Sequence, residues 1–206
     1  MDIKKIDTYI DSLNKKNTKE TIEGLSDISQ TGKIGFASSF SIEDMVILDL
    51  INKTRAKIQV FTIDSGRLPQ ETFDIIEEAR KKYEVEIEIL FPDTEAIEKM
   101  QKENGPNFFY NSIQDRRECC RIRKIEPLKR KLKDLEVWIT GLRKRQSITR
   151  SELKKIEVDE KFGLIKINPL FDWSEEDVWK YIKDNDVPYN KLYDSGYTSI
   201  GCDPCT

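Results

Sequence analysis

The chain has 206 residues, 35% of them charged and 37% hydrophobic, and its formal net charge at pH 7 is −3. This length predicts one domain, and so small a charge excludes a protein that binds nucleic acid through its bulk electrostatics. No apolar run reaches the length of a membrane span, and residues Met1–Lys5 lack the apolar stretch of a signal peptide. Histidine is absent, so any chemistry depends on cysteine, carboxylate, lysine, arginine, a cofactor or a partner.

The first half of the chain alternates predicted helices and strands. Residues 3–30 are expected to form two amphipathic helices that break near Asn17-Thr18, with Thr18 as the N-cap of the second. The predicted strands, each with its following helix, are Lys33–Ala37 and Ile42–Ile51, Lys57–Ile63 and Gln70–Lys82, and Val85–Phe91 and Asp93–Glu103. This alternation predicts right-handed crossovers and an α/β fold with a mostly parallel sheet flanked by helices.

Two polar loops follow the first two strands. The loop from Ser38 to Asp44 is rich in hydroxyl groups and runs into a helix N-terminus, which suits a phosphate or sulfate group as well as an ordinary serine cap. The loop from Asp64 to Arg67 contains Gly66, which permits a tight turn. Ligands of parallel sheets bind at the carboxyl ends of the strands, so we expect both loops at the same edge.

The second half begins with a basic helical segment at residues 113–133, in which Pro127 marks a kink or a new helix start. Its final part, Lys129–Lys133, is expected to be a solvated face. A strand at Glu136–Thr140 places Arg143 near another carboxyl end, where a guanidinium suits an anion. The remaining predicted elements are a hairpin at Val158–Ile167 and a helix that Ser174 caps and that ends at Lys183.

The four cysteines form two pairs. Cys119 and Cys120 are adjacent within a run of positive charge, and Cys202 and Cys205 form a CxxC turn. Neighbouring side chains of a helix point about 100° apart, so adjacent thiolates suit a bulky centre better than one small ion. Four thiolates in this arrangement can hold a tetrahedral zinc or an iron–sulfur cluster, and the spacing favours the cluster over zinc or a disulfide. Such cysteine usage indicates a reducing, cytoplasmic setting.

Six longer stretches, in this order, resemble one family. They are SFSIED (Ser39–Asp44), IDSGRLPQET (Ile63–Thr72), ECCRIRKIEPL (Glu118–Leu128), WITGLRKRQSITR (Trp138–Arg150), NPLFDWSEEDVW (Asn168–Trp179) and VPYNKLYDSGYTSIGCDPCT (Val187–Thr206). From about Lys33 to Thr206 the sequence is similar to the adenylyl-sulfate and phosphoadenylyl-sulfate reductases, in the subgroup that carries a 4Fe–4S cluster.

The resemblance implies a modified ATP-pyrophosphatase fold, of the adenine nucleotide alpha-hydrolase type. It implies a single reductase domain over residues 1–206, with N-terminal helices at 1–30. The first loop lacks the glycines of ATP-cleaving relatives, which implies a substrate with sulfate in place of the β-phosphate.

The resemblance also implies a set of site residues. Cys119, Cys120, Cys202 and Cys205 would ligate one 4Fe–4S cluster, and Lys124 would lie between that cluster and the substrate. Lys124 and Arg143 are the implied catalytic cations. The implied substrate-binding residues are Ser38, Ser39, Phe40, Ser41, Asp64, Ser65, Gly66, Arg67, Gly141 and Arg143.

The implied reaction is the reduction of adenylyl sulfate to sulfite and AMP with thioredoxin or glutaredoxin as thiol donor. In the family, a cysteine on a C-terminal tail beyond CxxCT forms an S-sulfocysteine that the partner thiol then cleaves. The sequence stops at Thr206 and its four cysteines are assigned to the cluster. We therefore expect the nucleophile to be missing from this chain and the chain to be inactive alone, and the resemblance further implies a cytoplasmic homo-oligomer.

Three alternatives stay open. Lys144 or Arg145 could accept a 3′-phosphate, which would make phosphoadenylyl sulfate the preferred substrate. A zinc-stapled nucleotide-binding module would have no redox chemistry. A cluster protein of nucleic-acid sulfur modification is supported only by the basic stretch that begins at Arg116.

Overall fold

A computed structural model describes residues 12–25, 33–146, 153–160 and 162–206 of the chain. Its strands are β1 (Ile34–Ala37), β2 (Gln59–Ile63), β3 (Ile87–Leu90), β4 (Val137–Ile139), β5 (Ile156–Asp159) and β6 (Leu164–Ile167). Its α-helices are α2 (Thr18–Leu25), α3 (Ile42–Thr54), α4 (Gln70–Tyr83), α5 (Thr94–Asn104), α6 (Ile113–Cys120), α7 (Glu126–Leu132) and α8 (Glu175–Asp184). Shorter helical turns are η2 (Phe108–Tyr110), η3 (Arg121–Ile125), η4 (Lys144–Gln146), η6 (Lys191–Ser195) and η7 (Asp203–Cys205).

The six strands form one sheet in the order β3-β2-β1-β4-β6-β5. All neighbouring pairs are parallel except β5 and β6, which form the antiparallel hairpin at one edge. The chain moves outward from β1 through β2 to β3, and then returns to the other side of β1 as β4. This reversal opens a crevice beyond the carboxyl ends of β1 and β4, which is where α/β sheets bind ligands.

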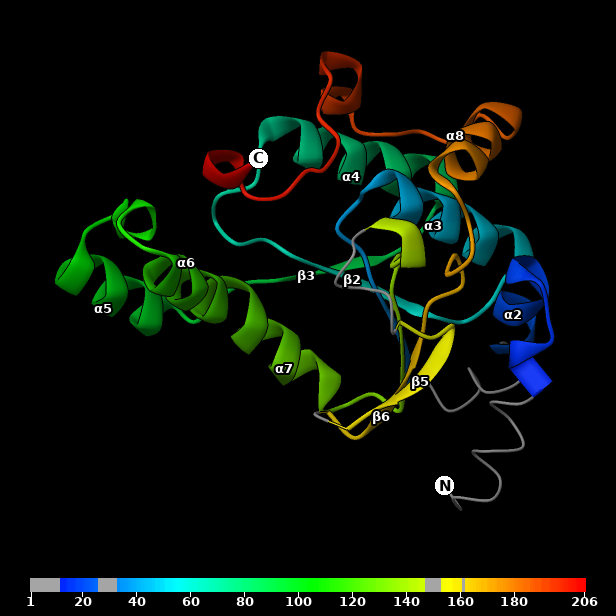
Figure 1. Cartoon of the computed structure of the whole chain (residues 1–206), viewed down its shortest axis with the longest axis horizontal. Helices are drawn as coiled ribbons and strands as arrows, with labels where there is room; N and C mark the ends of the chain where they lie inside the picture. Colours follow the sequence, from blue (N-terminus) through cyan, green and yellow to red (C-terminus); the bar gives the residue numbers. More distant parts are fainter. Residues whose placement is uncertain (1–11, 26–32, 147–152, 161) are drawn as a thin grey trace.

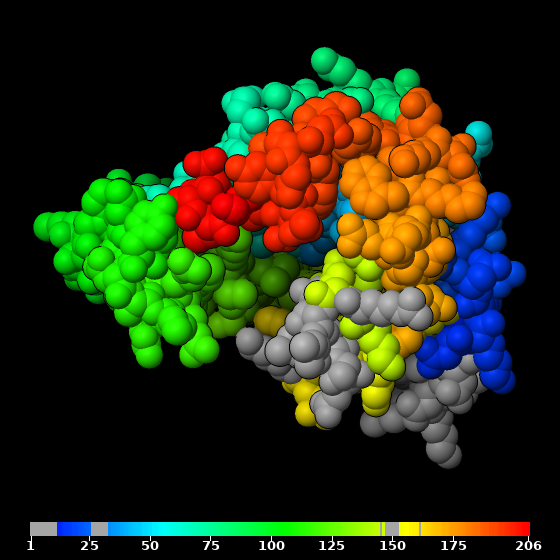
Figure 2. Space-filling view, turned by 45° about the horizontal axis from the view of Figure 1, so that its top comes forward, coloured from blue at the N-terminus to red at the C-terminus, as the bar shows by residue number. Residues whose placement is uncertain are grey.

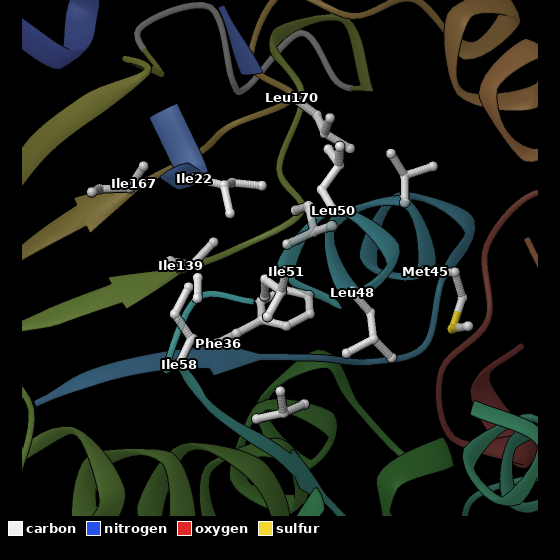
Figure 3. Close-up of a cluster of buried hydrophobic side chains, with 14 of the residues drawn as sticks. Ile22, Phe36, Met45, Leu48, Leu50, Ile51, Ile58, Ile139, Ile167 and Leu170 are labelled. Atoms are coloured by element: carbon white, nitrogen blue, oxygen red, sulfur yellow. The ribbon is translucent and has the colours of Figure 1, made fainter. Parts of the chain in front are cut away.

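Helices cover both faces of the sheet. Figure 1 shows α3, α4 and α8 on one side and α7 on the other. The main core lies under α3, where Phe36 of β1 packs with Leu48 and Ile51 (Figure 3). A second core, centred on Phe61 and Trp138, lies under α7. These apolar faces explain why the strands read as short hydrophobic runs and why the sheet is mostly parallel, as expected.

A separate small core supports the paired cysteines. Helices α5 and α6 and the turn η2 project beyond the sheet (Figure 1) and enclose Phe108, Phe109 and Cys119. Helix α6 continues without a break into the π-helical turn η3 and then into α7. Pro127 lies in the first turn of α7. Because proline has no backbone N–H, one α-helical hydrogen bond is missing here, and the helix can accommodate the wider π-helical turn that precedes it. Pro127 therefore marks a change from π-helical to α-helical geometry within one continuous helix, and not a new helix start.

Two local predictions are wrong. Thr18 does not cap α2, because Asn17 does. The Asn17 side-chain oxygen accepts a hydrogen bond from the Glu20 backbone amide at 2.9 Å, and the Asn17 backbone amide donates to the Glu20 carboxylate at 2.9 Å. Thr18 instead donates to the Pro169 carbonyl. Lys131 is not solvated either, since its side chain is 11% exposed and pairs with Glu88 at 2.6 Å. Most of the first predicted N-terminal helix, and all of residues 26–30, lie outside the described residues.

The other predicted elements lie where the sequence places them, with ends that differ by a few residues. Ser174 caps α8 through a reciprocal pair of hydrogen bonds with Asp177. None of the helices in the described part of the chain is long and apolar enough to cross a membrane.

Candidate active site

A cavity of about 730 Å³ lies at the crevice between β1 and β4. In Figure 2 the surface is hollowed between the red and orange C-terminal residues and the yellow-green residues that follow β4. Its lining is mostly polar and comes from four segments: Ala37, Ser39, Ser41, Ile42, Glu43 and Asp44; Thr140, Gly141, Leu142, Arg143 and Gln146; Ser174, Glu175 and Glu176; and Tyr193, Thr198, Ser199 and Ile200.

The loop after β1 is held in a tight conformation. Phe40 has a φ of 60°, a left-handed value that costs energy in a residue with a side chain. Its ring is 1% exposed and packs in the main core, while its amide donates to the Ser38 hydroxyl at 3.1 Å. This anchoring turns Ser39 and Ser41 toward the cavity. Ser41 stands at the N-cap of α3 but makes no side-chain capping bond.

Asp44 lies behind this loop and is 4% exposed. Its Oδ2 accepts hydrogen bonds from the Ser39 amide at 2.6 Å and from the Ser39 hydroxyl at 2.7 Å. Burial raises the pKa of Asp44 to about 6, against the lowering effect of the Ser39 hydrogen bonds. The end of β4 approaches so closely that a Cβ on Gly141 would lie 2.2 Å from Asp44 Oδ1. Gly141 therefore packs against the first turn of α3.

Arg143 and Glu43 form a buried ion pair at the same edge. Glu43 Oε1 accepts from Arg143 Nη2 at 2.8 Å, from Arg143 Nε at 2.9 Å and from the Gln146 amide at 2.7 Å. Both charged side chains line the cavity. The pair ties the loop after β4 to the N-terminus of α3 and neutralises the Glu43 charge beside a site that the sequence assigns to an anion.

A second cavity of about 210 Å³ shares Ala37, Ser39 and Ile200 with the first. Its walls are largely apolar, with Phe61 and Leu128 among them, and Lys124 is the charged residue that lines it. The Lys124 ammonium lies 3.9 Å from where a Cβ of Gly201 would be. Lys124 thus occupies the boundary between the hydroxyl loop and the segment that carries Cys202.

The two cysteine pairs lie on neighbouring segments. The Ser65 hydroxyl is 3.0 Å from Cys202 Sγ, and the Asp203 amide donates to the Arg67 carbonyl at 2.8 Å. Tyr110 donates to the Pro204 carbonyl at 3.2 Å. In Figure 2 the red C-terminal segment lies against the green helices that carry Cys119. All four cysteines are free thiols.

Arg123, which the sequence showed only as part of a basic run, connects these segments. It is 4% exposed, and its Nη1 donates to the Ser65 carbonyl at 2.6 Å. Its buried Nε has no hydrogen-bond partner. Burial raises the pKa of the Cys119 thiol, while the charges of Arg123 and Arg67 act in the opposite direction.

The segments that carry the four cysteines have features that suit an iron–sulfur cluster. Four free thiols on adjoining segments provide the required donors, and the unpartnered Arg123 Nε–H suits an anionic sulfur-rich group. In the described part of the chain, no group of three or more cysteine, aspartate or glutamate side chains is arranged to hold a metal ion. The donor set fits a cluster in its chemistry.

The predicted site residues fall into two groups. Ser39, Ser41, Gly141 and Arg143 line the larger cavity, whereas Ser38, Ser39 and Lys124 line the smaller one. The turn from Asp64 to Arg67 lines neither: Gly66 donates to Asp64 at 2.7 Å, and Arg67 lies 4.8 Å over the Phe109 ring. Phe40 contributes its backbone rather than its ring.

The sequence interpretation missed Glu43, Asp44, Gln146 and Arg123. The sequence prediction gave Glu43 and Asp44 no role of their own, although a pair of carboxylates beside a predicted anion loop was the signal available. Nothing in a single sequence distinguishes Arg123 from its exposed neighbours.

Comparisons with known proteins identify the family of this chain. Residues 33–206 match the sequence profile of the phosphoadenosine phosphosulfate reductase domain. The adenosine 5′-phosphosulfate reductase of Allochromatium vinosum is 48% identical over 186 residues, which are 90% of this chain and 73% of the relative. Adenosine 5′-phosphosulfate reductase 2 of Bacillus subtilis is 40% identical over 206 residues, covering 97% of this chain and 86% of the relative.

Solved structures show the same fold. A phosphoadenylyl-sulfate reductase from Candida auris, in a phosphate complex, superposes with a TM-score of 0.79 at 29% identity and covers 99% of this chain and 97% of its own. The FMN adenylyltransferase of Candida glabrata, with ATP, has a TM-score of 0.58 at 19% identity over 90% of this chain and 60% of its own, which is a likeness of fold alone. The predicted ATP-pyrophosphatase type of α/β fold is confirmed. The chain belongs to the phosphoadenosine phosphosulfate reductase family.

Proposed function

We propose that the two joined cavities bind adenylyl sulfate and that the protein reduces it to sulfite and AMP. The observation that carries this proposal is the position of Lys124, which lines a cavity between the hydroxyl loop and the CxxC segment. A cation at that boundary can contact an anionic substrate while it adjoins the segment that carries Cys202. The relatives named adenosine 5′-phosphosulfate reductase support the choice of substrate.

The phosphosulfate group would bind at the loop after β1. Ser39 and Ser41 offer hydroxyl groups, and the amides at the start of α3 offer positive ends of peptide dipoles. Arg143 and Lys124 supply cationic charge from the loop after β4 and from η3. The Asp64–Arg67 turn would border the nucleoside, because it follows β2, whose Phe61 and Ile63 line the smaller cavity.

The reduction would proceed by two displacements at sulfur. A cysteine thiolate attacks the sulfate sulfur, a bond forms between the two sulfur atoms, the bond from the sulfate sulfur to the bridging oxygen breaks, and AMP leaves with that oxygen. A thioredoxin or glutaredoxin thiolate then attacks the cysteine sulfur and sulfite leaves. The second thiol of the partner closes its disulfide and restores the enzyme thiol, so two electrons pass from the partner to sulfur.

The attacking thiolate would come from residues beyond Thr206. Our proposal assigns Cys119, Cys120, Cys202 and Cys205 to a 4Fe–4S cluster, and the sequence contains no fifth cysteine. When bound, such a cluster places a dense group of charge beside the substrate site. Arg123 would donate from its free Nε–H toward that group, and Ser65 would hold both Arg123 and Cys202 in place.

Three further features belong to the same proposal. The protein would act as a single reductase domain over residues 1–206. It would reside in the cytoplasm, where a reducing environment keeps free thiols and thioredoxin-type partners reduced. It would assemble as a homo-oligomer, which the mass measured in solution by light scattering would test.

A binding and metal assay tests the function. Anaerobically purified protein should contain about four irons and four sulfides per chain. It should bind adenylyl sulfate more tightly than the 3′-phosphorylated form in a competition assay. Tighter binding of the phosphorylated form would overturn the substrate choice, and a colourless protein with stoichiometric zinc would overturn the cluster.

A second assay tests the origin of the thiol. The 206-residue chain should bind adenylyl sulfate but release no sulfite with thioredoxin as the added thiol, whereas the same chain followed by a cysteine-containing tail should release it. Sulfite production by the 206-residue chain would contradict the tail mechanism.

A further inference from the structure

Asp44 differs from the other acidic groups of the larger cavity. Its side chain is 4% exposed, and among the described residues it takes part in no ion pair within 4 Å. Its neighbour Glu43 is as deeply buried but is neutralised by Arg143. Asp44 is therefore a buried carboxylate, beside a proposed anion site, whose charge is offset by hydrogen bonds alone.

Those hydrogen bonds occupy the donors that an anion would need. Both the amide and the hydroxyl of Ser39 point to the same oxygen of Asp44, at 2.6 and 2.7 Å. While Asp44 is ionised, Ser39 presents only oxygen lone pairs to the cavity. A phosphate or sulfate group cannot donate to lone pairs, so the ionised state of Asp44 opposes the function of the loop.

We propose that Asp44 takes up one proton from solvent when the anionic substrate enters the cavity, an inference that rests on the proposed function. The proton binds Oδ2, which then donates to Ser39 Oγ. This reverses the hydrogen bond, and the Ser39 hydroxyl hydrogen turns to the anion. One O–H bond forms, no electrons are transferred, and one negative charge is removed from beside the substrate.

The surrounding charges favour Asp44 as the group that titrates. Burial already raises its pKa to about 6, and the negative charge of an anion bound beside it raises the pKa further, so that the carboxyl gains a proton at neutral pH. The other charged groups that line this cavity are Glu43 on the same helix, Arg143 after β4, and Glu175 and Glu176 on α8. Tyr193, from η6, has a pKa raised to about 12 by burial and stays neutral.

Calorimetry tests the proposal with adenylyl sulfate as the probe. Its phosphosulfate has no proton that titrates between about pH 5 and pH 9, so any proton taken up belongs to the protein. Binding to the anaerobically purified chain, measured at about pH 7.5 in two buffers of different ionisation enthalpy, should show uptake approaching one proton per site. The dissociation constant should rise by up to about tenfold per pH unit above neutrality.

Two variants test whether the proton binds Asp44. Asp44→Asn keeps the size of the side chain and cannot ionise, so it should bind without proton uptake and with an affinity that is flat over the same pH range. Asp49→Asn is the matched control, because Asp49 is also buried on α3 but pairs with Lys53 at 2.7 Å and accepts from Tyr181. It should retain the uptake of the parent protein.

The possible outcomes distinguish the role of Asp44 from the proposed binding of adenylyl sulfate. Tight binding of adenylyl sulfate with no proton uptake, or an Asp44→Asn variant that keeps the pH dependence, would overturn the role of Asp44 and leave the proposed function standing. Failure of the parent protein to bind at any pH from about 6 to 8 would overturn both. The parent measurement decides the matter even if Asp44→Asn does not fold.

Discussion

Arg143 Nη2 lies 2.8 Å from Glu43 Oε1, and each of the two side chains is 6% exposed. The cation that faces the larger cavity is therefore fixed before any ligand arrives, by a carboxylate from the helix that begins at the same cavity. This arrangement reduces the conformational freedom that Arg143 would lose on binding an anion. It also makes each partner dependent on the other for stability.

The first prediction concerns that pair. Glu43→Ala should lower the free energy of unfolding by ~3 kcal/mol or more, because removing one partner leaves a buried guanidinium without its counter-charge. Urea denaturation would measure the loss. Glu136→Ala is the control, since Glu136 pairs with Lys33 on the surface and should cost less than ~1 kcal/mol. Similar losses in both variants would show that the buried pair has no special weight.

The second prediction concerns the close approach of β4 to α3. Gly141→Ala would place a Cβ 2.2 Å from Asp44 Oδ1, so one of the two segments must move. We expect a loss of ~1–3 kcal/mol in stability and an affinity for AMP at least about tenfold lower. Gly201→Ala is the control for stability, because its Cβ would meet no atom closer than 3.9 Å. Unchanged AMP binding in Gly141→Ala would contradict the packing described here.

The third prediction concerns Lys124. Lys124→Ala should weaken adenylyl sulfate binding about tenfold or more, as the loss of a charge-assisted contact implies. Lys133→Ala should have little effect, because Lys133 is exposed on the same basic segment. Lys131, which pairs with Glu88, is not a suitable control. Equal effects at Lys124 and Lys133, measured by calorimetry, would refute a special position for Lys124.

The fourth prediction is a pH dependence of stability that comes from Asp44. Its folded-state pKa of about 6 lies above its ordinary value of 3.8, chiefly because of burial. The folded state thus binds this proton more tightly than the unfolded state, so the contribution is complete below about pH 3.8 and is lost as the pH rises through 6. Asp44→Asn should gain up to ~3 kcal/mol relative to the parent between about pH 4 and pH 7. Parallel stability curves for the two proteins would contradict the buried, ionised carboxylate.

The fifth prediction concerns the cysteine region. Arg123→Met should reduce iron and sulfide content and speed the alkylation of the thiols, because it removes the link to Ser65 and the free donor beside Cys119. Arg121→Met lies in the same π-helical turn but affects an exposed pair with Glu118, and it should retain the metal. Equal metal loss in both variants would argue against a specific role for Arg123.

Much of the fold could be predicted because it is encoded locally. The apolar run at Ile34–Ala37 and the periodic helix after it mark β1 and α3 within a few residues. The order of the strands could not be predicted, since β1 pairs with β4 through contacts a hundred residues apart in the sequence. The N-cap of α2 was misplaced by one residue because Asn17 and Thr18 both have capping side chains, and the tertiary bond of Thr18 to Pro169 decided between them.

The candidate site was predicted in outline only. Serine hydroxyls and a strand-end arginine predict an anion site, but the sequence does not show that Arg143 is already paired or that Ser39 donates to Asp44. Those facts depend on how closely β4 approaches α3, which Gly141 permits. Burial, rather than residue type, separates Arg123 and Lys131 from the solvated basic residues around them.

The far wall of the larger cavity, at Thr198–Ile200, has a consequence for synthesis in the cell. The ribosome synthesises Ser39 and Ser41 early and Thr198–Ile200 much later, and both segments line the cavity. Through most of translation the hydroxyl loop stays open to water. A ligand stabilises only the folded form that binds it, so substrate can protect this protein only after translation has passed the CxxC segment. Growing chains must depend on their own core, or on chaperones, until then.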